Sequence, residues 1–268
     1  MRRVLELKTV QSSAFKVLVE ALKELLTDTC IEFDATGVKI VAMDSSHVIL
    51  VHLRLDAGKF EEYRCDQRLS VGVNMLNMHK LIKTINSNDT LTFFMDDDDI
   101  NHLGIKIENA EKNTRTTYKL NLLDLDNTKI TIEPTEFSDV ITLPSADFQK
   151  ICRDMCNLSE LVEIRSINNK LIFCCKGDFC NQETVFSDSD DGTRIVPAAA
   201  AGGGRRDVVV QGVFNLKYLV LFTKCTNLCN TVELYLKNDY PLIVKYMVAS
   251  LGEIKLCLAP QSPQAAAA

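Results

Sequence analysis

The sequence lacks the segments that would take it into or across a membrane. No apolar run approaches the roughly 20 residues that a membrane-spanning helix needs. The N-terminus, MRRVLELKTVQSS, has no uninterrupted apolar core such as a secretion signal has. With 268 residues and 46% hydrophobic content, the chain can bury one large core or two joined ones. We therefore expect a folded intracellular protein.

Closely paired metal-binding cysteines are also absent, although the chain has ten cysteines. No CxxC pair occurs and the four histidines are scattered, so the usual spacing of a structural zinc site is missing. Cys152/Cys156 and Cys225/Cys229 are each spaced i, i+4 on predicted helices, which leaves open a shared metal or a cysteine-dependent enzyme. Reduced thiols that pack as small apolar residues are the preferred interpretation. We predict no metal and no cofactor.

Signatures of catalysis are missing as well. A glycine run precedes basic residues at positions 202–206, but the P-loop spacing G-x-x-x-x-G-K-[ST] is absent. We find no Ser-His-Asp order and no nucleophile elbow. The acidic runs at residues 96–99 and 124–126 are interpreted as solvated turns. We therefore predict that the protein is not an enzyme.

What the sequence does contain is a repeat. Residues 12–26, SSAFKVLVEALKELL, carry apolar side chains at helical spacing, and the pattern returns 133 residues later. Later segments match at a shift of 140. Matched pairs include Phe15 with Phe148, Leu22 with Met155, Gly72 with Gly212 and Val73 with Val213. We infer two tandem copies of one unit, each about half the chain.

The hydrophobic pattern predicts four helices and more than a dozen short strands. The helices are expected at residues 12–26, at 75–85, from Pro144-Ser145 onward, and at 215–225. This pattern is typical of an α+β fold, mostly antiparallel sheet with helices on one side. Residues 123–136 are predicted to be an extended connector between the copies. Residues 187–206 are predicted to be a mobile surface loop.

Each predicted helix carries a pair of basic residues, although the net charge of the chain is −6. The pairs are Lys16/Lys23, Lys80/Lys83, Lys150/Arg153 and Lys217/Lys224. A solvated charged face explains any one pair, but four pairs indicate a common cationic surface on an otherwise acidic chain. No aromatic platform for single strands and no recognition helix accompanies them. We predict sequence-independent contact with the phosphates of double-stranded nucleic acid.

Several motifs together resemble one family, the DNA sliding clamp of eukaryotes and their viruses, proliferating cell nuclear antigen. They occur in the family's order and cover nearly the whole chain: MDSSHV (43–48), YRCD (63–66), GVN (72–74), LLDLD (122–126), ICRDM (151–155), LFTK (221–224) and LAP (258–260). The resemblance implies an N-terminal clamp domain at residues 1–122, an interdomain connector at 123–136, a C-terminal clamp domain at 137–262 and a tail at 263–268.

The resemblance also implies assembly and partners. Three identical subunits would close head to tail into a ring, with the helices of each lining a channel around duplex DNA. The eight basic residues fall where the family's pore-facing residues lie. Such a ring is a polymerase processivity factor and a docking platform for replication and repair proteins, loaded by a clamp loader in the nucleus or a viral replication compartment. A specialised paralogue in a hetero-oligomeric repair or checkpoint ring is the alternative.

Family members bind short hydrophobic and aromatic motifs of their partners beneath the connector. The matching positions are Met43, His47, Val48, Leu50, Ile130, Ile132, Pro134, Pro241, Ala259 and Pro260, although core packing would explain each one alone. Cys257 stands where an aromatic residue is usual, and Asn168 stands where the family has its modifiable lysine. The family's subunit-interface strands correspond to residues 111–118 and 177–186, which match poorly.

Overall fold

The structure, a computed structural model, describes residues 2–126, 130–132, 134–189, 192–197 and 209–261 of the chain. The backbone forms two compact units. Unit 1 consists of Met1–Thr131 together with Met247–Ile254, and unit 2 consists of Ile132–Tyr246 together with Lys255–Ala268. Within the described residues, no helix is both long and apolar enough to cross a membrane.

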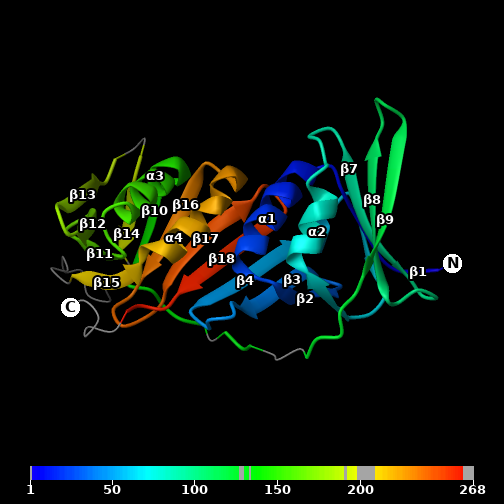
Figure 1. The fold of residues 1–268 in the computed structure, drawn as a ribbon, viewed down its shortest axis with the longest axis horizontal. Coiled ribbons are helices and arrows are strands. Elements are labelled where there is room, and N and C mark those ends of the chain that lie inside the picture. Colours follow the sequence, from blue (N-terminus) through cyan, green and yellow to red (C-terminus); the bar gives the residue numbers. More distant parts are fainter. Residues whose placement is uncertain (1, 127–129, 133, 190–191, 198–208, 262–268) are drawn as a thin grey trace. The chain divides into compact units, whose positions relative to one another are not determined.

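Unit 1 alternates short strands with two helices (Figure 1). Their bounds are β1 Arg3–Thr9, α1 Ser12–Leu25, β2 Asp28–Asp34, β3 Gly37–Met43, β4 Ile49–Asp56, the 3-10 helix η1 Ala57–Lys59, β5 Glu62–Cys65, β6 Leu69–Asn74, α2 Met75–Ile82, β7 Thr90–Asp96, β8 His102–Asn109 and β9 Thr114–Asn121.

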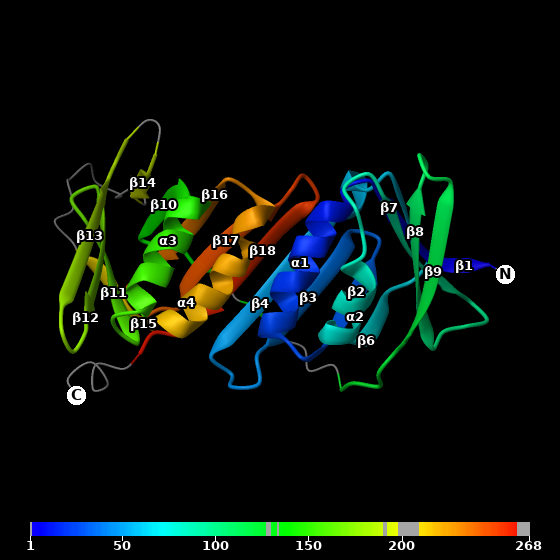
Figure 2. The ribbon, with the colours of Figure 1, turned by 45° about the horizontal axis from the view of Figure 1, so that its top comes forward.

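Two sets of antiparallel strands form the sheets of unit 1. One sheet has the order β5-β1-β7-β8-β9, and in the other β4, β3, β2 and β6 are successive neighbours. Helices α1 and α2 lie side by side over β2, β3 and β4 in both views (Figures 1 and 2). Phe15, Leu18 and Leu22 of α1 are buried in an apolar core with Ile40 and Leu53. The apolar stripe of residues 12–26 therefore faces the sheet, which leaves the polar face to solvent.

Unit 2 has the same succession of elements. Its bounds are β10 Asp139–Pro144, α3 Ser145–Cys156, β11 Leu161–Ile167, β12 Lys170–Lys176, β13 Asn181–Ser187, β14 Arg194–Pro197, β15 Val210–Asn215, α4 Leu216–Phe222, the 3-10 helix η2 Thr223–Leu228, β16 Thr231–Leu236, β17 Leu242–Val248 and β18 Gly252–Leu258, whose first residues belong to unit 1.

The sheets of unit 2 repeat those of unit 1. The order β14-β10-β16-β17-β18 corresponds to β5-β1-β7-β8-β9, and β13-β12-β11-β15 corresponds to β4-β3-β2-β6. The pairs within unit 2 are antiparallel as well. The predicted tandem repeat of a mostly antiparallel α+β unit is confirmed. Its cause is the repeated spacing of buried residues, such as Phe15 and Phe148, Leu22 and Met155.

Two local predictions were wrong. Residues 187–206 are not loop throughout, because Arg194–Pro197 form β14 and pair with β10; residues 190–191 and 198–208 lie outside the described part. The fourth helix ends at Phe222 and continues as the 3-10 helix η2, so Cys225 and Cys229 do not share one α-helix. Cys229 is the extended residue that ends η2.

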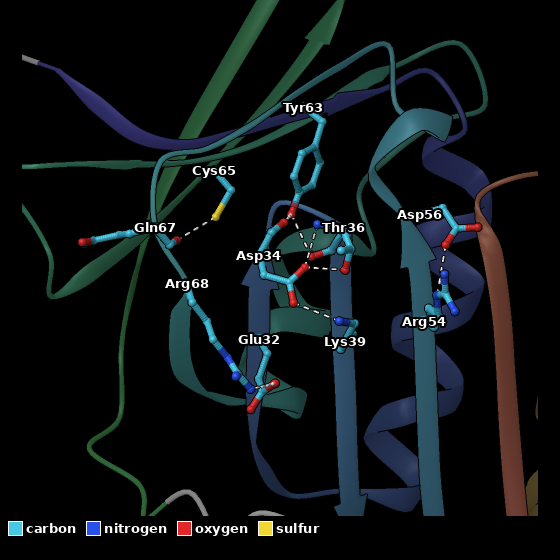
Figure 3. Close-up of polar contacts among 11 residues, drawn as sticks. Glu32, Asp34, Thr36, Lys39, Arg54, Asp56, Tyr63, Cys65, Gln67 and Arg68 are labelled. Carbon is cyan, nitrogen blue, oxygen red and sulfur yellow. Dashed lines mark hydrogen bonds and ion pairs between the residues drawn. The ribbon is translucent and has the colours of Figure 1, made fainter. Parts of the chain in front are cut away.

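Tyr63 of the YRCD motif holds β5 to the turn between β2 and β3 (Figure 3). Its hydroxyl lies 2.7 Å from Asp34 O and 2.8 Å from Gly37 O, and donates to this pair of carbonyls. Burial raises the pKa of the Tyr63 phenol well above its usual value. The Asp34 carboxylate accepts hydrogen bonds from Thr36 and pairs with Lys39 at 2.9 Å, which holds the pKa of Asp34 far below its usual range. The motif therefore fixes a turn.

Candidate functional site

The basic pairs of unit 1 differ in how freely they face solvent. Lys16 is half-buried, and its Nζ donates to Ile85 O at 3.0 Å. The Lys23 side chain is 19% exposed and pairs with Glu24 at 2.6 Å. Lys80 on α2 and Lys83 just after it are exposed, and Lys80 makes only a long contact of 3.4 Å with Asn77. The two residues near α2 are therefore the more available cations of this unit.

In unit 2 all four basic residues are exposed. Lys150 pairs with Asp154 one turn along α3, at 2.7 Å. For Arg153, Lys217 and Lys224 the structure records no ion pair with any described residue. The Asn215 side chain accepts a hydrogen bond from Lys217 N at 2.9 Å and so caps α4, which begins at Leu216.

Acidic neighbours reduce the positive charge of two helices. Helix α1 contains Lys16 and Lys23 but also Glu20 and Glu24, so its formal charge is 2 − 2 = 0. Helix α3 contains Lys150 and Arg153 but also Asp147 and Asp154, which again gives 2 − 2 = 0. An approaching polyanion would compete with these carboxylates for the same cations. The i, i+4 spacing of Lys150 and Asp154 is a signal in the sequence that predicts such pairing.

His79 lies on α2 among the charges of both unit 1 helices. Burial and the nearby positive charge of Lys23 lower the pKa of its imidazole, against the opposing effect of Glu20. The ring is therefore neutral at neutral pH. It was not among the predicted site residues.

The loop between β3 and β4 and the adjoining ends of these strands carry four of the predicted partner-binding residues. Met43 is 39% exposed, His47 is exposed with φ 56°, and Val48 and Leu50 are half-buried. The aromatic ring and the thioether therefore stand on the surface of unit 1. This loop is the best defined part of the candidate partner surface.

Asp44, which was not among the predicted site residues, stabilises this loop. Its carboxylate accepts hydrogen bonds from Val48 N at 2.9 Å, from Ile49 N at 2.7 Å and from Ser46 N at 3.2 Å. Burial opposes its ionisation, but these bonds outweigh burial and lower the pKa of Asp44. The signal that predicts such a turn is an Asp followed by small polar residues, as in MDSSH.

The connector begins at a fixed point on unit 1. Leu123 N donates to Gly72 O at 2.8 Å, and a Cβ on Gly72 would lie only 2.3 Å from Leu123 O. Glycine at position 72 is therefore needed for this close approach. Farther along, Ile130 is half-buried, Ile132 is 42% exposed and Pro134 is exposed, while residues 127–129 and 133 lie outside the described part.

The remaining partner-binding candidates belong to unit 2. Pro241 follows Tyr240, whose hydroxyl is 2.9 Å from Thr135 Oγ1, and is half-buried. Ala259 and Pro260 are half-buried after β18. Cys257 precedes them, and burial raises the pKa of its thiol to about 11.

Asn168 occupies the turn between β11 and β12. Asn168 and Asn169 have φ values of 50° and 57°, the left-handed conformation at both central positions of a tight hairpin. Asparagine tolerates this conformation better than lysine. The two asparagines therefore suit this tight hairpin, and a lysine at position 168 would fit it less well.

Cys152 and Cys225 are free, buried thiols. Burial raises the pKa of Cys152 and of Cys225, so neither is an activated nucleophile. Among the described residues, no group of three or more His, Cys, Asp and Glu side chains is arranged to hold a metal ion. Cys152 and Cys225 are therefore best explained as core residues, whereas Cys156 is exposed and Cys229 is half-buried.

Two comparisons with known proteins agree with the repeat. Residues 4–129 match the model of the proliferating cell nuclear antigen N-terminal domain, and residues 131–261 match that of its C-terminal domain. A curated relative from Paramecium bursaria Chlorella virus 1, described as a probable DNA polymerase sliding clamp 1, is 37% identical over 258 residues, which is 95% of each chain. With both halves matched in order, the chain belongs to the proliferating cell nuclear antigen family of DNA sliding clamps.

Proposed function

We propose that three copies of the chain close into a ring around double-stranded DNA and keep a DNA polymerase on its template. The observation that carries this proposal is that each α-helix of the described residues, α1 and α2 in unit 1 and α3 and α4 in unit 2, carries basic side chains, although the net charge of the chain is −6. A ring that encloses DNA needs only weak, sequence-independent phosphate contacts. The family membership and the viral relative support the same function.

The way in which the chain pairs with itself supports the ring. In unit 1 the start of β18 lies beside β4: Asp56 N donates to Leu251 O at 2.9 Å, and a Cβ on Gly252 would lie 2.1 Å from Arg54 O. Residue numbers rise along one strand as they fall along the other, so the two strands are antiparallel.

The strands that correspond to β18 and β4 in the other copies of the repeat have no such partner among the described strands. β9 corresponds to β18 and β13 corresponds to β4, and each has a neighbour on one side only among the described strands. We infer that β9 of one copy pairs with β13 of the next. This contact is heterologous, because it joins two different surfaces, and it can therefore close a ring. That the ring contains three copies is inferred from the family.

Partner proteins are expected at the loop of residues 44–48 and the connector. Met43 and Ile132 are large apolar side chains that are 39% and 42% exposed, as suits a surface for a short apolar motif. A polymerase, a clamp loader and repair proteins are the proposed partners, at the site of DNA replication in the nucleus or a viral compartment. The ring itself performs no reaction in this proposal.

The test begins with the mass in solution. Sedimentation of the purified chain should give about 3 × 30.0 = 90 kDa. The ring should then stay on closed circular DNA, slide off after linearisation and stimulate a polymerase on primed circles. A chain that forms its ring only after another clamp subunit is added would favour the hetero-oligomeric alternative. A stable monomer that stimulates no polymerase would contradict the proposal.

A further inference from the structure

Phe179 is the most exposed of the large apolar side chains that the structure describes. It is 79% exposed at the tip of the β12–β13 hairpin, and Val185 on β13 is 45% exposed. The outward positions of β13 are the odd-numbered ones, Asn181, Glu183, Val185 and Ser187. Phe179 continues this outward series past the end of the strand.

The hairpin tip holds Phe179 in a fixed place. Gly177 N donates to Cys180 O at 2.9 Å across the turn. A Cβ on Gly177 would lie 2.2 Å from Leu158 O, so the turn rests directly on the chain that follows α3. A short, supported turn presents its aromatic side chain with little freedom left to lose on binding.

The repeat identifies what Phe179 would meet. If β9 pairs with β13 as β18 pairs with β4, the start of β9 at Thr114 lies beside the end of β13 at Ser187. The strands have eight and seven residues, so the residues just past the end of β9 come beside the residues just before the start of β13. The outward residues are odd-numbered on both strands, and directly opposite residues of an antiparallel pair share a face. The register that satisfies this condition pairs Ser187 with Arg115, and it places Phe179 of one copy opposite Leu123 of the next.

Leu123 is suited to receive an aromatic ring. It is 38% exposed, and its hydrogen bond to Gly72 O holds it in place. The odd-numbered residues of β9, such as Thr117 and Lys119, point outward, and Leu123 continues that series just as Phe179 does on β13. Both apolar side chains therefore project from the same outward face of the paired strands.

We propose that Phe179 is an apolar anchor between copies of this chain and packs on Leu123 of the neighbouring copy. The inference rests on the ring of the proposed function and names the contact that stabilises each of its joints. Phe179 and Leu123 continue the edges of β13 and β9, and both side chains are apolar. A second copy of the chain is therefore favoured as the partner that covers them. Buried aromatic side chains within an interface commonly dominate its binding energy.

The test compares Phe179→Ala, Leu123→Ala and the double variant with the unchanged chain. Val10→Ala is the control, because Val10 is 56% exposed just after β1, a strand that pairs with β5 and β7 and not with β9 or β13. Each sample is diluted, and its dissociation into monomers is followed by mass photometry. We expect each single variant to weaken the contact about 10- to 100-fold, and the double variant to weaken it little further.

The outcomes separate this inference from the proposed function. Unchanged dissociation of Phe179→Ala and Leu123→Ala, with a trimeric unchanged chain, would overturn the anchor and leave the ring. Reduced polymerase stimulation by an intact Phe179→Ala trimer would assign Phe179 to a partner protein and would also overturn it. If the chain without substitutions does not form a trimer, both the ring and the anchor are overturned. Circular dichroism of each variant checks that the subunit is folded.

Discussion

Leu123 N donates a hydrogen bond to Gly72 O at 2.8 Å, so the connector starts from a fixed point on β6. An equivalent bond occurs after β18, where Gln261 N donates to Val213 O of β15 at 2.8 Å. In both units the chain that leaves the last strand thus covers the edge strand of the other sheet. These bonds protect two edges that would otherwise be open.

Replacing Gly72 with Val should displace the connector. A Cβ at this position would lie 2.3 Å from Leu123 O, which real structures do not tolerate. We expect a loss of about 1–3 kcal/mol in the free energy of unfolding and weaker binding of partner peptides, measured by urea denaturation and fluorescence anisotropy. Gly58→Ala is the matched control, because no atom lies within 4 Å of a Cβ there. Equal effects of both substitutions would contradict the explanation.

Replacing Asp44 with Ala should loosen the β3–β4 loop. The carboxylate holds Val48 N and Ile49 N, and their loss is expected to cost about 1–3 kcal/mol. Since the folded-state pKa of Asp44 is lowered, its stabilisation is complete above the unfolded pKa and is lost as the pH falls through the folded one. Urea denaturation at pH 7 and below pH 4 should show the difference between variant and unchanged chain shrink in acid. The exposed Asp98→Ala is the control.

Replacing Asp154 with Asn should strengthen the hold on DNA. Lys150 pairs with Asp154 at 2.7 Å, and both side chains are largely exposed. Removing the carboxylate frees the Lys150 cation for phosphates and adds one net positive charge per subunit, so retention on circular DNA should rise about two- to tenfold at low salt. Asp98→Asn makes the same change of charge away from the helices. If both variants bind alike, net charge alone explains the gain.

His79 should make the subunit less stable in mild acid. Its pKa is lowered in the folded state, mainly by burial, so the unfolded chain binds the proton first as the pH falls. The free energy of unfolding should therefore decrease as the pH drops below the ordinary histidine value of about 6.5. Urea midpoints at pH 7.5 and 5.5 should show a smaller decrease for His79→Gln, while the exposed His47→Gln should behave as the unchanged chain does.

The repeated architecture could be predicted from sequence because burial at regular spacing is local information. The helical spacing of apolar residues that defines α1 recurs in α3, and the buried residues Phe15 and Phe148 occupy corresponding places. Strand β14 was missed since its four residues are stabilised by β10, which lies about fifty residues earlier. Helix α4 was predicted too long because its apolar residues continue at helical spacing into η2.

Only part of the candidate site could be predicted from the sequence. Basic residues on helices are visible in the sequence, but the pairing of Lys23 with Glu24 and the bond from Lys16 to Ile85 O depend on side-chain positions. Asp44 was overlooked because its role is to hold backbone amides and not to meet a partner. The need for glycine at position 72 becomes apparent only from the structure, in which Leu123 O lies close to it.

β9 and β13 are the two longest edge strands of this repeat, with eight and seven residues. A newly made subunit therefore carries two unsatisfied rows of backbone donors and acceptors, which are templates for aggregation and strand exchange. In the proposed ring each of these two rows pairs with another copy, so the hazard is greatest when the concentration of subunits is low.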